Sequence, residues 1–257
     1  IVSIDNKRIN NEINNGLVVV IAGFQGYNEN FEITTLGRGG SDTTAVALAA
    51  SLKADICEVY TDVEGIFTAD PKIVKNAKKI DYLSYEDMLE LANYGAKMHP
   101  RSIELGLHYN IPIIIKSSFE NGPGTIISNI EKLNDLQKRG IILNKITENR
   151  NKVTGVTSEG NISKITLHNV PDKPGIAAKV FKPLSEAGIN VDVIVQNISK
   201  NHKTDLTFTV KNEDLNHALI IVQNKSIKNI NYENITSGSN YAKISIIGTG
   251  IQNSPGY

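Results

Sequence analysis

Short apolar runs alternate with helical patterns through the first half of the chain. Residues 17–22 form a continuous apolar run that ends at Gly23, which predicts a central strand of a parallel sheet. Further strands are expected at residues 31–36, 56–61 and 111–116, between helical patterns. This order predicts an α/β domain with a mainly parallel sheet.

Each helix expected between these strands has a chemical signal at its start. Ser41 or Asp42 is placed to cap the first helix, whose apolar residues recur at helical spacing to about residue 53. Ser84 opens the second helix in capping-box style, Gly95 ends it, and Pro100 begins the third. These signals also define the loops in which ligand-binding residues are sought.

The pattern changes after residue 152. Strand patterns at residues 164–167, 189–196, 204–210 and 227–232 enclose helical patterns at residues 176–187 and 213–222. This β-α-β-β-α-β order is that of a ferredoxin-like α+β domain. Pro183 lies inside the first of the two helices, where we expect a kink because proline removes a hydrogen bond.

A repeat appears near the end of the chain. Lys-Ile-Thr-Leu at residues 164–167, followed by Pro174 and Gly175, returns as Lys-Ile-Ser-Ile at residues 243–246, followed by Pro255 and Gly256. The predicted divisions are a first domain over 1–128, a linker over 129–152, a small domain over 153–235 and the start of a second copy over 236–257. We expect the chain to be a piece of a longer protein, cut at both ends.

Composition and charge narrow the class of function. The formal net charge is +0, which argues against nucleic acid as the main partner. The single cysteine, Cys57, excludes an intramolecular disulfide and fits a reducing compartment. No apolar run is long enough to span a membrane, and no signal-peptide pattern or metal-ligand spacing is visible. A cytoplasmic protein without a membrane partner is expected.

The strongest local signal is the glycine-rich turn at residues 37–40, between a predicted strand and a predicted helix. Glycines let the backbone approach a ligand closely, and the amides of a helix N-terminus favour an anion. Arg38 within the turn is suited to binding a carboxylate or a phosphate through two hydrogen bonds. The spacing alone leaves an ordinary strand-to-helix turn equally open.

Two further segments carry polar residues at the ends of predicted elements. Thr61 and Asp62 directly follow an apolar strand, and ligands of open parallel sheets bind at the carboxyl ends of strands. Lys97 precedes a helix and could meet a phosphate. A polar loop and a solvated lysine are the simpler interpretations of these residues, and we assign His99 no role.

Taken together in this order, these motifs resemble the aspartate kinase family, within the amino acid kinase superfamily. The similarity covers the runs at residues 34–50, 60–71 and 95–100, and residues 167–196 resemble an ACT domain, an amino-acid-sensing module. The resemblance implies phosphorylation of the β-carboxylate of L-aspartate by ATP with Mg²⁺, in the biosynthesis of lysine and threonine. It also implies an amino acid kinase fold followed by ACT domains.

The resemblance also implies roles for individual residues. Arg38, Gly39, Gly40 and Ser41 match the substrate-binding run, with Asp42 as the catalytic acidic residue. Thr61, Asp62, Phe67, Lys72 and Lys97 match the ATP-binding positions. Phe67 stands where many members have tyrosine, and Lys72 where many have arginine. The family's Lys-Phe-Gly-Gly strand and its acidic substrate-binding residue upstream are absent from this sequence.

Regulation is implied by the ACT resemblance. Asp172, Ala177, Ile189, Asn190, Val191 and Gln196 match positions that bind an amino-acid effector, expected to be lysine or threonine. Homo-oligomers, or association with a regulatory subunit, are expected through the ACT domains. Another amino acid kinase, such as an acetylglutamate kinase, and a non-catalytic effector-binding protein stay open as alternatives.

Overall fold

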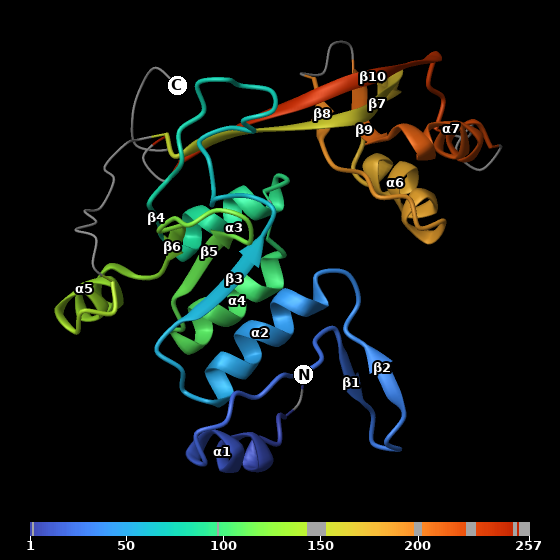
Figure 1. Cartoon of the computed structure of the whole chain (residues 1–257). Coiled ribbons are helices and arrows are strands. Elements are labelled where there is room, and N and C mark those ends of the chain that lie inside the picture. Colours follow the sequence, from blue (N-terminus) through green and yellow to red (C-terminus); the bar gives the residue numbers. More distant parts are fainter. Residues whose placement is uncertain are drawn as a thin grey trace. The chain divides into compact units, whose positions relative to one another are not determined.

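The computed structural model describes residues 1, 3–96, 98–142, 153–197, 202–224, 230–248 and 251 (Figure 1). The chain forms two compact units. Unit 1 consists of Ile1–Thr157 together with Ser245–Tyr257, and unit 2 consists of Ser158–Ile244. Unit 2 is therefore inserted into unit 1, because the chain leaves unit 1 and later returns to it.

Unit 1 is built around a four-stranded sheet with the strand order β3-β5-β6-β4. The strands are β3 (Cys57–Thr61), β4 (Tyr82–Leu83), β5 (Ile113–Ser117) and β6 (Thr125–Ile127). The pairs β3–β5 and β4–β6 are parallel, and β5–β6 is antiparallel. This arrangement confirms the α/β class with a mainly parallel sheet.

Three of the helices that accompany this sheet share one core, and two of the three begin at the residues that the sequence signals mark. They are α2 (Gly40–Ser51), α3 (Tyr85–Asn93) and α4 (Pro100–Tyr109). Ser84 caps α3 by accepting a hydrogen bond from the Asp87 N–H at 3.1 Å, and Pro100 occupies the first turn of α4. The apolar faces of these helices supply Val46, Met88 and Ile103, each with no exposed surface, to one core.

The predicted strand at residues 17–22 is wrong. The segment has no regular structure, and Val18 and Val20 are each 93% exposed. A central strand needs a neighbour to take its backbone hydrogen bonds, and within the described residues β3 is the edge of the sheet. The apolar run therefore has no strand beside it.

A short hairpin lies next in the sequence. Strand β1 (Gln25–Tyr27) pairs antiparallel with β2 (Ile33–Thr35). The strand expected at residues 31–36 is thus present, but it forms a separate two-stranded sheet. A short helix, α1 (Lys7–Asn14), precedes this region and buries no residue.

The segment that the sequence assigns to the start of the linker is structured. Asn129 accepts a hydrogen bond from the Lys132 N–H at 2.8 Å and so caps α5 (Ile130–Lys138). Leu133 and Leu136 of α5 are fully buried in a cluster with Tyr82 and Ile114 of the sheet. Residues 143–152, the rest of the expected linker, lie outside the described residues.

Unit 2 has the ferredoxin-like order that the sequence predicts. Its elements are β7 (Gly155–Pro171), α6 (Ile176–Glu186), β8 (Ile194–Gln196), β9 (Lys203–Lys211), η1 (Asn212–Asp214), α7 (Leu215–Gln223) and β10 (Asn234–Ile247). The sheet order is β10-β7-β9-β8. Leu206, Phe208 and Val210 alternate along β9 and are buried against Val180 and Leu184 of α6. The helix α6 continues through Pro183.

Two strand predictions in unit 2 need correction. Only residues 194–196 of the predicted strand 189–196 are a strand, because the Ile189 N–H donates to the Leu184 carbonyl at 2.9 Å and so closes the end of α6. Of the strand predicted at residues 227–232, residues 230–232 are not a strand and residues 227–229 lie outside the described residues; the next strand, β10, begins at Asn234. Residues 243–246, the second copy of the repeat, belong to the same strand β10, and its Pro255 and Gly256 lie outside the described residues.

None of the helices in the described part of the chain is both long and apolar enough to cross a bilayer.

The packing of α5 gives a stability test. We expect Leu133→Ala to lower the free energy of unfolding by about 2–5 kcal/mol, because it leaves a cavity in a fully buried cluster. Ile130→Ala on the same helix is the control, since Ile130 is already 37% exposed. Urea unfolding followed by circular dichroism measures both. Equal, small effects would mean that α5 is not part of the core.

Candidate functional site

The glycine-rich segment forms a tight turn that leads directly into α2. The Gly40 N–H donates to the Gly37 carbonyl at 3.0 Å, and Gly39, between them, has φ 71° and ψ 15°. A positive φ at the third residue of such a turn is the mark of type II, which requires glycine there. Gly39 is also the N-cap of α2, so the predicted caps Ser41 and Asp42 lie instead within the first turn of the helix.

Arg38 stands at the corner of this turn and is exposed, as is Ser41. Asp42 is half-buried in the first turn of α2. The hydroxyls of Thr43 and Thr44 donate back to the Gly39 and Gly40 carbonyls at 3.0 and 2.7 Å. These bonds fix the turn on the helix, at the end where helix amides have no partner within the helix.

The carboxyl ends of β3 and β5 bring further polar groups together. Thr61 is in register with Ser117, and the Ser118 N–H donates to the Thr61 carbonyl at 2.8 Å. The Thr61 hydroxyl donates to Asp62 Oδ1 at 3.1 Å. Sequence reasoning missed Ser117 and Ser118, although they also directly follow an apolar strand.

The glycine turn and the carboxyl end of β3 lie toward the same end of the sheet. Helix α2 ends at Ser51 and β3 begins at Cys57, and the two elements run in opposite directions (Figure 1). The first turn of α2 is thus carried to the end of unit 1 at which β3 finishes. Anion-binding amides and a strand-end polar cluster at one edge are typical of ligand sites in open α/β sheets.

The other predicted nucleotide residues are less closely grouped. Phe67 is half-buried and forms an isolated antiparallel bridge with Lys79. Lys72 is exposed, and its N–H donates to Asp70 Oδ1 at 2.9 Å. Lys97 lies outside the described residues. The structure therefore brings Thr61 and Asp62 together and leaves Lys72 on a solvent-facing loop.

Cys57 has no place in this candidate site. Burial raises the pKa of its thiol to about 11, and the Asp42 and Glu58 carboxylates add to the rise. The thiol is therefore neutral near pH 7 and not a nucleophile. No group of three metal-ligating His, Cys, Asp or Glu side chains occurs in the described ranges.

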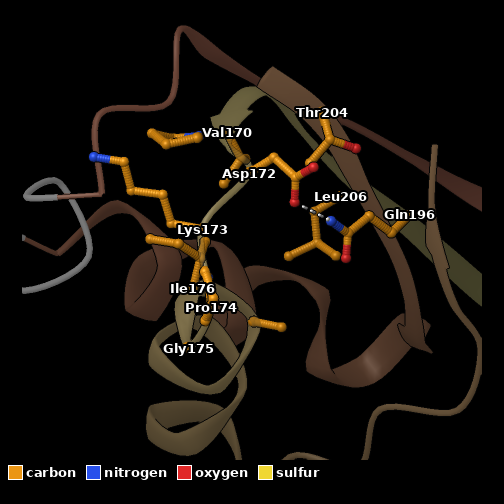
Figure 2. Close-up of a pocket in the computed structure, with 11 residues that line it drawn as sticks. Val170, Asp172, Lys173, Pro174, Gly175, Ile176, Gln196, Thr204 and Leu206 are labelled. Atoms are coloured by element: carbon orange, nitrogen blue, oxygen red, sulfur yellow. Dashed lines mark hydrogen bonds between the residues drawn. The ribbon is translucent and has the colours of Figure 1, made fainter. Parts of the chain in front are cut away.

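A second candidate site is a pocket of about 330 Å³ in unit 2 (Figure 2). It is lined by the segment at residues 170–177 and by three strand residues, Gln196, Thr204 and Leu206. Gly175, with φ 86°, is the N-cap of α6, so this pocket also meets a helix N-terminus. It combines backbone amides with a carboxylate, an amide and a hydroxyl side chain.

Asp172 and Gln196 converge in this pocket, as Figure 2 shows. Gln196 Nε2 donates to Asp172 Oδ1 at 3.4 Å, a long bond that a ligand could replace. Ala177 also lines the pocket, whereas Ile189 is buried in the core and Val191 packs against it. Asn190 is exposed and is not among the lining residues.

Among the polar lining side chains, sequence reasoning missed Lys173 and Thr204. Thr204 donates to the Asn197 carbonyl at 2.7 Å. It begins the alternation that carries Leu206, so the period of two along β9 could have placed it on the same face. For Lys173, the only sequence feature that could have indicated a place in the pocket is its position in the turn before α6.

Comparison with known proteins finds a family match in each of the two units. Residues 1–117 match the amino acid kinase family, and residues 168–225 match the ACT domain. An aspartokinase of Bacillus sp. (strain MGA3) is 42% identical over 259 residues, which cover 100% of this chain and 59% of the relative. The chain thus spans about three-fifths of the length of the curated relatives it matches.

Solved structures of aspartate kinases are also similar to this chain. Clostridium acetobutylicum aspartate kinase, described as an allosteric enzyme, matches with a TM-score of 0.74 and 26% identity, covering 91% of this chain and 51% of the other. E. coli aspartokinase III in complex with lysine and aspartate matches with a TM-score of 0.65 and 28% identity, covering 88% and 47%. The same enzyme with aspartate and ADP gives a TM-score of 0.62 at 28% identity, covering 91% and 49%.

The two matched domains occur here in one order, within a chain that is similar to aspartate kinases along its whole length. This chain is therefore similar to aspartate kinases over its whole length, and its first 117 residues match the amino acid kinase family.

Proposed function

We propose that the full-length protein is an aspartate kinase that transfers the γ-phosphoryl group of ATP to the β-carboxylate of L-aspartate, giving 4-phospho-L-aspartate. The observation that carries the proposal is the type II turn with Arg38 at its corner, which leads into the N-terminus of α2. A guanidinium beside helix amides suits an amino acid with two carboxylates. The relatives named above support aspartate as that amino acid.

In this proposal the turn holds the acceptor. Arg38 binds a carboxylate of aspartate, while the backbone of Gly39, Gly40 and Ser41 surrounds it. Asp42, in the first turn of α2, is the catalytic residue that orients the reacting groups. Phosphoryl transfer relies mainly on such positioning and on charge stabilisation.

The nucleotide occupies the carboxyl ends of β3 and β5. Thr61 and Asp62 contact it there, with Phe67, Lys72 and Lys97 as further contacts. ATP arrives as its Mg²⁺ complex, in which the metal ion neutralises part of the phosphate charge. The ADP complex of E. coli aspartokinase III supports a nucleotide site in a relative.

The reaction is tested by an acceptor screen on the full-length protein. ATP consumption is measured with aspartate, glutamate and acetylglutamate at equal concentrations, and we expect turnover with aspartate. Turnover with acetylglutamate alone would assign the protein to another amino acid kinase. Amino-acid binding without turnover would make it a non-catalytic effector-binding protein.

Two substitutions separate the acceptor site from the nucleotide site, and each is the control for the other. Losing a charge-assisted hydrogen bond worth about 2 kcal/mol corresponds to roughly 30-fold, so Arg38→Ala should raise the KM for aspartate by that factor. Its KM for ATP should change little. Asp62→Ala should show the reverse pattern. Steady-state kinetics with each substrate varied measures both, and a shared pattern in the two variants would contradict the assignment.

We further propose that the pocket of unit 2 binds a feedback effector, lysine or threonine. The amides at the start of α6 would receive its carboxylate, and Asp172 would pair with its ammonium group. Gln196 and Ala177 complete the contacts that line the pocket. Ile189, Asn190 and Val191 support the strand beside it. The lysine complex of E. coli aspartokinase III supports this class of effector.

The effector site has its own test. We expect Asp172→Ala to shift the inhibition curve to higher lysine or threonine, because the ammonium group loses its partner. A hydrogen bond between charged groups contributes about 1.5–3 kcal/mol, so the shift should be roughly tenfold or more. Glu186→Gln, on the exposed far end of α6, is the matched control. Activity and direct binding are titrated together; normal binding with a reduced basal rate would make Asp172 a folding residue.

We also propose that the ACT domain mediates self-association or binding to a regulatory subunit. The cytoplasm is the proposed location, where lysine and threonine biosynthesis would use the product. The buried, unpaired thiol of Cys57 is compatible with this reducing compartment.

A further inference from the structure

Residues at the start of α4 pack against the glycine turn at residues 37–40. A Cβ atom added to Gly39 would lie 2.4 Å from Cβ, Cγ and Cδ2 of His99. Carbon atoms in good contact are about 3.5–4.0 Å apart, so the His99 side chain already packs directly on the Gly39 backbone. The shape of His99 therefore sets how closely α4 approaches the turn.

Arg101 holds the chain where it enters the same turn. Its Nη1 donates to the Leu36 carbonyl at 3.3 Å. The Leu36 N–H in turn donates to the Phe24 carbonyl at 2.9 Å, which ties this point to the segment before the β1–β2 hairpin. Two side chains at the start of α4 thus contact this region: Arg101 at Leu36, just before the turn, and the N-cap His99 at Gly39.

Neither contact is required to begin α4. Pro100 provides the first turn, His99 Nδ1 accepts from the Arg101 N–H at 3.3 Å, and the Ser102 hydroxyl donates to the His99 carbonyl at 2.6 Å. All of these bonds lie within the helix start. The contacts of His99 with Gly39 and of Arg101 with Leu36 reach 60 and 65 positions back along the chain and support the turn.

We propose that His99 and Arg101 are positioning residues for the acceptor site. They hold the type II turn in the shape that presents Arg38 to a carboxylate, and they act through the turn backbone without touching the substrate. This inference rests on the proposed function of Arg38. It assigns a role to His99, in the segment at residues 95–100 that also contains the predicted nucleotide contact Lys97, and to Arg101 just after that segment.

The test must separate capping of α4 from support of the turn. Asparagine is a favoured N-cap, so His99→Asn keeps an acceptor for the Arg101 N–H but removes the ring that packs on Gly39. Because small displacements of positioned groups have large kinetic effects, we expect the KM for aspartate to rise roughly 10-fold in this variant. The KM for ATP and the Tm should stay near the wild-type values.

Arg101 provides a second, independent arm. Arg101→Met removes the donor to Leu36 at similar side-chain length and should also raise the KM for aspartate. Arg101→Lys keeps a charged donor and should recover part of the loss. His108→Asn, at the exposed end of the same helix, is the matched control and should behave as wild type.

The outcomes are distinct. An unchanged KM for aspartate in both His99→Asn and Arg101→Met, with an active wild type, would overturn this inference alone. Equal increases in both KM values together with a lower Tm would mean a purely structural role and would also overturn it. A wild-type protein that does not phosphorylate aspartate would overturn the proposed function, and this inference with it.

Discussion

The parallel pairing of β3 with β5 is the constraint on which the candidate catalytic site depends. The register from Cys57 opposite Ile113 to Thr61 opposite Ser117 makes both strands end at the same level. Helix α2 returns antiparallel to β3, so its N-terminal turn lies toward that end as well. The burial of Ile113 and Ile115 in one core cluster and of Ile114 in the other holds this register, because a shift by one residue would move each side chain to the opposite face of the sheet. The same strand register therefore determines both the packing of the core and the position of the candidate site residues.

Elements whose signals are local could be predicted from the sequence. Ser84 and Pro100 start their helices as expected, since caps depend on a few neighbouring residues. The run at residues 17–22 could not be read in this way, because whether an apolar run becomes a strand depends on a partner strand elsewhere. The sequence assigns residues 130–138 to a linker, because the burial of α5 against Tyr82 and Ile114 depends on contacts distant in the chain.

The candidate sites show the same division. Arg38, Thr61 and Asp62 stand out because glycines and strand ends mark them, and the meeting of Asp172 with Gln196 follows from the β-α-β order. The packing of His99 on Gly39 brings together residues 60 positions apart, and no local sequence pattern predicts this contact. Likewise, the alternation from Ile189 onward predicts a strand, but the Ile189 N–H bonds to the Leu184 carbonyl at the end of α6, and the strand begins only at Ile194.

The insertion of unit 2 into unit 1 has a consequence for how the chain folds. The Thr154 N–H donates to the Ile247 carbonyl at 2.7 Å, and Ile247 is buried in the core of unit 1. Without a folded unit 2, forming this bond would require closing a long flexible loop, which carries an entropic cost. A folded unit 2 shortens the effective loop and lowers that cost. The stability of unit 1 is therefore tied to that of unit 2 through chain entropy, independently of any ligand.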